Sequence, residues 1–258
     1  RNFVAFFFAG AILIKNHTSL KLPKKTFVPL FLRSLFGTLG ILCNFYALDH
    51  LDLADASILN KMSPFFAIVF SIFLLKEKIK PVQMFIVTGA LVGAMCVVKP
   101  SFSNVSTIPA LLALCGGMCA GLAYTFVRML GQRGVKGPVI VCFFSGFSCL
   151  VTLPFLIFNF TPMSLVQLAM LILAGLSAAG GQFTITSAYC YAPAKDVSVY
   201  DYSQIIFTAA IGFIVFGQIP DWLSWVGYVI ICLMAVLMFI YNKKRDEKAD
   251  ALKKVKEN

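Results

Sequence analysis

The chain has 258 residues, of which 59% are hydrophobic and only 13% are charged, and its mean hydropathy is +0.87. Soluble domains are about half apolar and about a quarter charged, so these values exclude a soluble protein and predict a chain embedded mainly in lipid. The net charge of +11 would suggest nucleic-acid binding in a soluble protein. Here the basic residues lie between apolar segments, so membrane orientation explains them and we expect no nucleic-acid partner.

The chain opens with an apolar segment from Phe3 to Ile14, which is too short to cross a bilayer comfortably. Because residue 1 is Arg, we expect a truncated chain that starts inside a helix. Eight longer apolar segments follow, and in chain order they are Phe27–Leu48, Ala56–Leu75, Val82–Val98, Ile108–Val127, Val139–Phe158, Leu165–Ala188, Ser198–Phe216 and Trp222–Tyr241. Each predicts a helix, because an apolar segment in lipid must satisfy its own backbone. The sequence therefore predicts an all-α, polytopic membrane helix bundle with about nine helices.

The polar residues separate into two sets of alternating connectors. Most Lys and Arg residues fall on one set, together with a charged tail at residues 242–258. The opposite connectors carry one lysine and four aspartates: Lys99, Asp49, Asp52, Asp55 and Asp221. Because Lys and Arg in short loops mark the cytoplasmic face, we expect a multi-pass protein of the plasma or cell inner membrane with a cytoplasmic C-terminus. One missing first helix would place the N-terminus on the same side.

An internal repeat appears when the sequence is shifted by 141 residues. The shift aligns these pairs: Leu35 with Leu176, Gly40 with Gly181, Ala47 with Ala188, Asp55 with Asp196, and Ser57 with Ser198. The Asp55 connector lies on the acidic side and the Asp196 connector on the basic side, so the two copies have opposite orientations. We expect a first repeat at 1–100 and a second at 101–241. Inverted repeats are typical of secondary transporters, whose substrate site lies near the midplane between the halves.

Several motifs in these repeats resemble a known family. They are Arg33 with Gly37-Thr38-Leu39-Gly40, Phe45-Tyr46-Ala47-Leu48, Ala54-Asp55-Ala56, Ser63-Pro64, Leu75 with Glu77, and Gly89 in the first copy, and Tyr189, Ala192 and Asp196 in the second. With them the chain resembles the drug/metabolite transporter superfamily, in particular its EamA type, and the first copy is similar to solute carrier family 35 group G. The resemblance implies ten helices in two five-helix repeats, and hence a lost first helix. The second copy has Ile205 in place of Pro64 and Gln218 in place of Glu77.

Ionisable residues inside the predicted spans are candidates for the substrate site, because charge in lipid is costly. Arg33 lies about 9 Å inside its span at helical rise, and Lys61 lies at a similar depth from the other face. The two heads could bracket a central cavity and attract a carboxylate or a phosphate. The alternative for Lys61 is that its side chain bends to the nearer interface, and for Arg33 we favour a structural role between helices.

Further candidates surround these two cations. Asp201 aligns with Asn60, lies beside Tyr202, and would suit proton coupling, although proximity to the interface explains it as well. The remaining candidates are polar residues within spans: Asn44, Tyr46, Gln182 and Tyr189. Such amides and hydroxyls also hold helices together through hydrogen bonds.

The function that these features predict is secondary transport of a small metabolite, anionic or amino-acid-like, by alternating access. The expected partners are this small-molecule substrate and the lipid bilayer, with a homodimer as a further expectation. A non-transporting regulatory or interaction subunit with a transporter fold is the alternative, since fold does not determine function. We expect no enzyme, because no cluster of His, Asp or Ser suits intramembrane catalysis. With two His residues and cysteines only in apolar segments, we expect no metal and no other cofactor.

Overall fold

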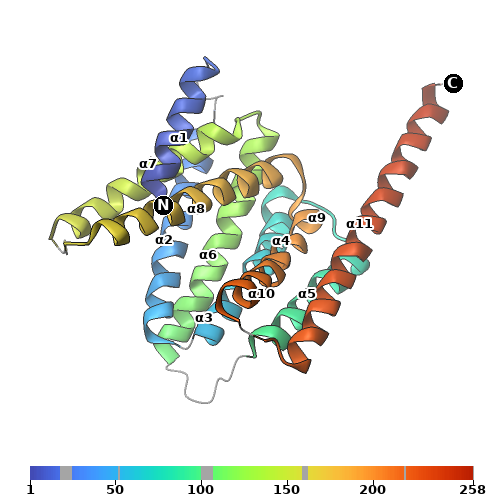
Figure 1. The fold of residues 1–258 in the computed structure, drawn as a ribbon. Helices are drawn as coiled ribbons and strands as arrows, with labels where there is room; N and C mark the ends of the chain where they lie inside the picture. Colours follow the sequence, from blue (N-terminus) through green and yellow to red (C-terminus); the bar gives the residue numbers. More distant parts are fainter. Residues whose placement is uncertain (18–24, 52, 100–106, 159–161, 218, 258) are drawn as a thin grey trace.

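The computed structural model describes residues 1–17, 25–51, 53–99, 107–158, 162–217 and 219–257, and every element within these ranges is helical. For positions 53–55, 216, 246 and 248–257 it describes the backbone only. The elements, labelled in Figure 1, are α1 (Asn2–Lys15), α2 (Phe27–His50), α3 (Leu53–Asn60), α4 (Ser63–Leu75), α5 (Pro81–Val98), α6 (Thr107–Gln132), α7 (Gly137–Phe158), α8 (Leu165–Tyr191), α9 (Ala194–Val197), the 3₁₀ turn η1 (Tyr200–Tyr202), α10 (Ser203–Phe216) and α11 (Trp222–Glu257).

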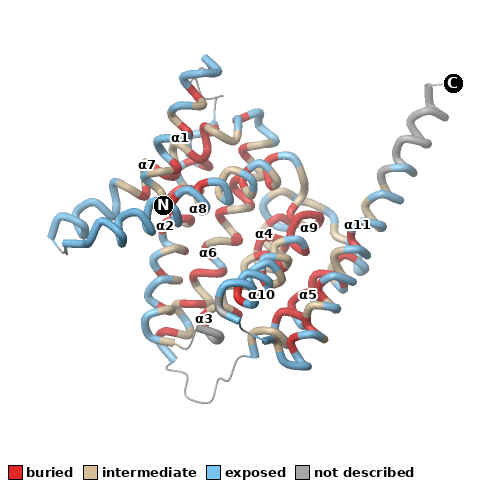
Figure 2. Tube along the Cα trace, in the orientation of Figure 1, coloured by how far each residue is buried: buried red, intermediate tan, exposed pale blue. Residues whose placement is uncertain are grey.

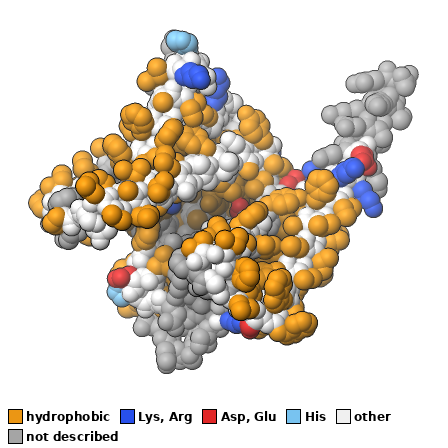
Figure 3. All heavy atoms as spheres, in the orientation of Figure 1, with side chains coloured by type: hydrophobic (Ala, Val, Ile, Leu, Met, Phe, Trp, Pro, Cys, Tyr) orange, Lys and Arg blue, Asp and Glu red, His pale blue; other side chains and the backbone are white. Residues whose placement is uncertain are grey.

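The described ranges contain eight spans that are long and apolar enough to cross a membrane, and α1 is a ninth, shorter apolar helix. Their positions match the eight predicted segments and the short first one, which confirms the all-α membrane bundle. Large apolar side chains face outward, among them Phe73, Phe155 and Leu165. Hydrophobic side chains cover most of the face shown in Figure 3. A surface this apolar fits lipid as the surrounding solvent.

Two spans that were predicted as continuous helices are interrupted. The first is divided into α3 and α4 by a turn at Lys61 and Met62. Pro64 occupies the second position of α4, where it has no N–H to bond the carbonyl of Asn60, and this missing bond favours the break between α3 and α4. In the second span α9 ends at Val197, and the tighter 3₁₀ turn η1 precedes α10.

Close backbone contacts join the helices at the core of the bundle. A Cβ atom on Gly40 of α2 would lie 3.1 Å from the carbonyl oxygen of Gly116 in α6. A Cβ atom on Gly227 of α11 would lie 2.6 Å from the carbonyl oxygen of Gly93 in α5. Small residues allow such an approach between helices in membranes. Figure 2 shows that buried residues run along α4, α5 and α6, whereas the joined ends of α7 and α8 are exposed.

The last helix is longer than its predicted span. It continues past Tyr241 and through the charged segment as far as Glu257, so the tail predicted at residues 242–258 is largely a continuation of α11. Figure 1 shows this end of α11 projecting away from the bundle.

Candidate functional site

The two interrupted spans meet and hydrogen-bond to each other at the centre of the bundle. The Tyr202 hydroxyl donates to the carbonyl oxygen of Lys61 at 3.1 Å, and the Ser198 hydroxyl donates to that of Pro64 at 3.2 Å. The Lys61 ammonium donates to Gln204 Oε1 at 2.5 Å. Lys61 and Tyr202 are 141 residues apart, the offset of the predicted repeat. The carbonyl of Lys61, which lies in the turn between α3 and α4, is therefore bonded by a side chain of the other span.

A carboxylate lies beside this contact. The Tyr189 hydroxyl donates to Asp201 Oδ2 at 3.0 Å, and Asp201 also interacts electrostatically with Lys61. The fully buried Tyr189 ring stacks on that of Tyr124 from α6, with ring centres 4.6 Å apart and planes within 1° of parallel. Each charge near the interruptions thus has a neutral hydrogen-bond partner: Lys61 donates to Gln204, and Asp201 accepts from Tyr189.

A cavity of about 200 Å³ adjoins these residues. Its lining comes from α2, α3, α6, α7 and α8 together with the start of the chain, and its polar members are Arg1, Arg33, Asn44, Asn60, Tyr124 and Gln182. Figure 3 shows the molecule hollowed between α8 and α10. Ligand sites often lie between the helices of a bundle, and the lining of this cavity is half polar, which suits a polar ligand.

The structure distributes the predicted site residues over three places. Four of them line the cavity: Arg33, Asn44, Asn60 and Gln182. Four lie at the central contact: Lys61, Tyr189, Asp201 and Tyr202. The ninth, Tyr46, is exposed and stacks on His50 at 4.1 Å, away from the cavity lining.

Sequence reasoning missed two aromatic residues of the cavity, Tyr124 and Phe144. Tyr124 could have been noticed as a phenol inside an apolar span. Phe144 could not, because the chain has 26 phenylalanines and nothing distinguishes the one that contacts Arg33.

Arg33 has an unusual environment for a charged residue. It is 3% exposed, and its guanidinium carbon lies 4.1 Å from the centre of the Phe144 ring. Its Nε is buried and has no hydrogen-bond partner among the described residues. An arginine can be held over an aromatic face by cation–π attraction, but this contact leaves its hydrogen-bond donors unused.

Charged contacts close the end of the bundle that is predicted to be cytoplasmic, here called the basic end. Arg245 of α11 donates from Nη1 to both carboxylate oxygens of Asp196, at 3.1 and 2.8 Å. The amide of Gln83 in α5 donates to Asp196 Oδ1 at 3.0 Å. Nearby, Arg128 Nε lies 3.3 Å from Glu77 Oε1, and Arg128 Nη1 donates to the carbonyl oxygen of Cys190 at 3.0 Å. These bonds connect α9 to α5 and α11, and connect α6 to α8 and to the segment between α4 and α5.

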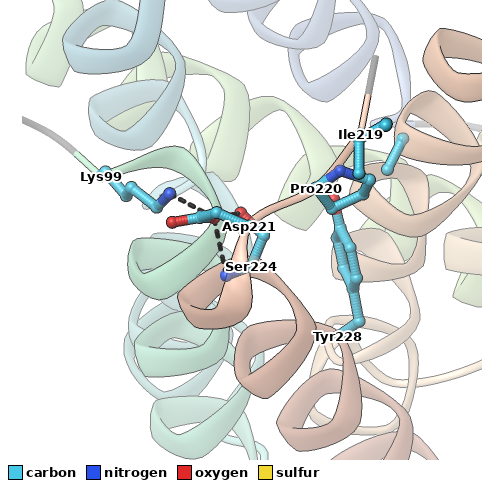
Figure 4. A pocket seen from close by; sticks show the side chains of 7 residues that line it. Lys99, Ile219, Pro220, Asp221, Ser224 and Tyr228 are labelled. Atoms are coloured by element: carbon cyan, nitrogen blue, oxygen red, sulfur yellow. Dashed lines mark hydrogen bonds and ion pairs between the residues drawn. The ribbon is translucent and has the colours of Figure 1, made fainter. Parts of the chain in front are cut away.

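The opposite end has a simpler and more exposed contact, shown in Figure 4. Lys99, which follows α5, forms an ion pair with Asp221, which precedes α11. Asp221 also accepts hydrogen bonds from the Ser224 hydroxyl at 2.7 Å and from its backbone N–H at 3.2 Å. The bond from Lys99, followed by those from Ser224, lowers the pKa of Asp221 to about 2. A pocket of about 370 Å³ adjoins this pair.

Known proteins resemble this chain in sequence and in fold. The EamA-like transporter family matches residues 1–99 and 107–240. The chain belongs to this family. The pseudopaline exporter CntI of Pseudomonas aeruginosa is 31% identical over 239 residues, which cover 90% of this chain and 84% of that protein. Solute carrier family 35 member G1 of Mus musculus is 26% identical over 235 residues, covering 81% of this chain and 61% of that one.

A solved crystal structure shares the fold, with a TM-score of 0.76 at 17% identity over 92% of this chain and 85% of that one. The predicted resemblance to EamA-type drug/metabolite transporters, including solute carrier family 35 group G, is therefore confirmed. This EamA protein is an integral, multi-pass membrane protein and a membrane transporter.

Proposed function

We propose that this chain is a secondary transporter that moves a small metabolite by alternating access, with residues 1–100 and 101–241 acting as two oppositely oriented repeats. The observation that carries the proposal is the contact between the two interrupted spans beside a cavity, made by Tyr202 and the carbonyl oxygen of Lys61. Interrupted helices at a repeat interface form the substrate sites of many secondary transporters.

In this mechanism the charged contacts at the two ends are the gates. The basic end is closed by the Glu77–Arg128 pair and by the bond from Gln83 to Asp196, and the opposite end is closed by Lys99–Asp221. Substrate shifts the balance between the states only by binding one state more tightly than the other. The repeats would rock about the central contact, so that one gate opens as the other closes.

The relatives support transport of a small molecule. The protein from Pseudomonas aeruginosa is named an exporter of pseudopaline, and the cavity of about 200 Å³ suits a small metabolite. The proposal does not include catalysis, and no group of three or more His, Cys, Asp or Glu residues within the described ranges could hold a metal ion.

Flux through proteoliposomes tests the proposal. The purified chain is reconstituted and offered labelled succinate, alanine or uridine, which represent carboxylates, amino acids and nucleosides. We expect saturable flux of at least one class above that of protein-free liposomes. Binding of a solute without any flux would contradict transport and would favour the regulatory-subunit alternative.

Alternating access has its own test. In a cysteine-free background, Ile79→Cys reports on the basic end and Ala209→Cys reports on the opposite end, because both residues are half-buried beside a gate and form none of its ion pairs. We expect a transported solute to change the labelling rates of these two sites in opposite directions. Parallel changes at both ends would contradict the two-gate mechanism.

A further inference from the structure

The starting point is the uncompensated charge of Arg33. This guanidinium is nearly fully buried and lines the cavity. Among the described residues it has no ion pair, and Nε is left without a hydrogen-bond acceptor. Leaving a buried charge unpaired is costly, and the cost is higher at the depth of a bilayer. The other polar residues of the lining are Arg1, Tyr124 and the amides Asn44, Asn60 and Gln182, and none of them supplies a negative charge.

The position of the guanidinium is enforced by its neighbours. A Cβ atom built on Gly37 would lie only 2.1 Å from Arg33 Nη1 and 2.8 Å from the Phe144 ring. Glycine at position 37 thus leaves the space that the guanidinium and the edge of the Phe144 ring occupy, and the face of that ring contacts the guanidinium. A pre-positioned guanidinium loses little freedom when it binds an anion.

We propose that Arg33, placed by Gly37 and Phe144, binds the carboxylate of the transported metabolite in this cavity. The inference rests on the proposed transport function and names its substrate class. One monoanionic carboxylate neutralises one guanidinium and can use two of its donors at once. The remainder of the ligand faces the amides of Asn44, Asn60 and Gln182. The volume equals that of about seven waters, which suits a small carboxylic acid with a polar tail.

Lys61 is the less suitable anion site in this conformation. Its ammonium donates to Gln204 Oε1, interacts electrostatically with Asp201, and is absent from the cavity lining. Arg1 does line the cavity, but it is exposed, and its Nε donates to the side chain of Asn2. Arg33 also has no equivalent in the second repeat, where the 141-residue offset places Ala174. The anion site is therefore a feature of one half only.

A thermal-unfolding assay on the full chain in nanodiscs tests the proposal with three probes that differ at one end group. Succinamate carries a carboxylate, succinamide a neutral amide, and 4-aminobutanamide an ammonium. At 20 mM probe and constant ionic strength, we expect succinamate to raise Tm by about 3 °C or more, because ligand binding stabilises the folded state. The other two probes should shift Tm by less than about 1 °C.

Variants assign the effect to Arg33. Arg33→Gln should weaken succinamate binding at least tenfold, and Gly37→Ala should weaken it similarly while keeping the arginine, because the new Cβ displaces the guanidinium. Should Arg33→Gln not fold, Gly37→Ala gives the same answer. The matched control is Arg133→Gln, which removes the same group from an exposed residue that bonds the carbonyl oxygen of Lys25. This control should bind as the parent does.

The outcomes that overturn the inference are equal shifts for succinamate and succinamide, no shift with any probe, or undiminished binding by Arg33→Gln. A shift with inorganic phosphate but none with succinamate would replace the carboxylate by a phosphate ligand. Flux assays separate this inference from the proposed function. Succinamate binding without flux of any solute overturns transport and leaves the anion site standing. Uridine flux without succinamate binding overturns the anion site and leaves transport standing.

Discussion

Helices α2 and α8 occupy equivalent positions in the predicted repeat, yet they have opposite surroundings. Both are long and apolar, with 24 and 27 residues. In the apolar stretch that could cross the membrane, 44% of the residues are buried in α2 but only 11% in α8. Gly40 of α2 packs against Gly116, whereas a Cβ on its counterpart Gly181 would meet nothing within 4 Å in the described part of the chain. A small residue therefore permits close helix packing but does not produce it.

The two helices also differ in the charge that they carry at one pair of equivalent positions. Arg33 of α2 is buried against Phe144, and the offset position in α8 is the exposed Ala174. Of these two helices, only α2 brings a cation into the cavity.

The largest expected effect is the loss of stability when the close packing of α2 against α6 is disturbed. Gly40→Leu places a side chain against the Gly116 backbone, and we expect it to destabilise the protein by about 3 kcal/mol through overpacking. Gly181→Leu is the matched change in α8 and should alter stability by about 0.5 kcal/mol or less. Thermal unfolding of both variants measures the difference. A large loss in Gly181→Leu would show that another segment or another copy packs on α8.

The next effect concerns how α8 is held at its basic end. Arg128→Met removes the donor to the carbonyl oxygen of Cys190 and leaves Glu77 buried without its partner. We expect a loss of about 2 kcal/mol and faster hydrogen exchange in the last turns of α8. Adding Glu77→Gln should restore part of the stability, because no unpaired charge then remains. A double variant as unstable as the single one would contradict this role for the ion pair.

A smaller effect comes from one hydroxyl in each helix. The buried Thr38 of α2 shares a 2.5 Å hydrogen bond with Ser148 of α7, whereas Thr184 of α8 bonds to carbonyls of its own helix. Thr38→Val should cost about 1 kcal/mol, and Thr184→Val about 0.5 kcal/mol or less. Chemical denaturation in mixed micelles compares them. Equal losses would mean that the α2–α7 bond contributes nothing specific.

The smallest effect lies where α5 meets α11, the last helices of the two predicted repeats. Lys99 holds the pKa of Asp221 at about 2, below its ordinary value of 3.8, so the stabilisation is complete above about pH 4 and is lost as the pH falls through about 2. The Tm difference between the parent and Asp221→Asn should stay constant from pH 8 to pH 5. A difference that changes within this range would point to a different titrating group.

Hydropathy was sufficient to predict the eight spans and α1, because a lipid environment demands long apolar helices whatever their neighbours are. The interruption after Asn60 was foreseeable from Pro64, which lacks a backbone donor. The one before Ser203 was not, because Ile205 stands at the equivalent position and the turn depends on contacts made by Tyr202 and Ser198 with the other repeat.

For the site, the argument that charge is costly in lipid singled out Arg33, Lys61 and Asp201, and the structure places all three at the cavity or beside it. The sequence alone could not show which partner each of these three residues contacts. The sequence left Lys61 open between an anion site and a side chain bent to the interface. The structure shows that the Lys61 ammonium donates to Gln204, while Arg33 lies over an aromatic ring without such a partner among the described residues. Tyr46 lies elsewhere, because a polar residue in a span can equally face outward.

The bond from the Tyr202 hydroxyl to the carbonyl oxygen of Lys61 makes the two kinks mutually dependent. If α3 and α4 merged into one continuous helix, the carbonyl of Lys61 would bond to a backbone amide of that helix. The Tyr202 hydroxyl would then lose its acceptor in the buried interior. Neither kink can therefore be remodelled alone. Evolution, or an engineer, would have to alter both in concert.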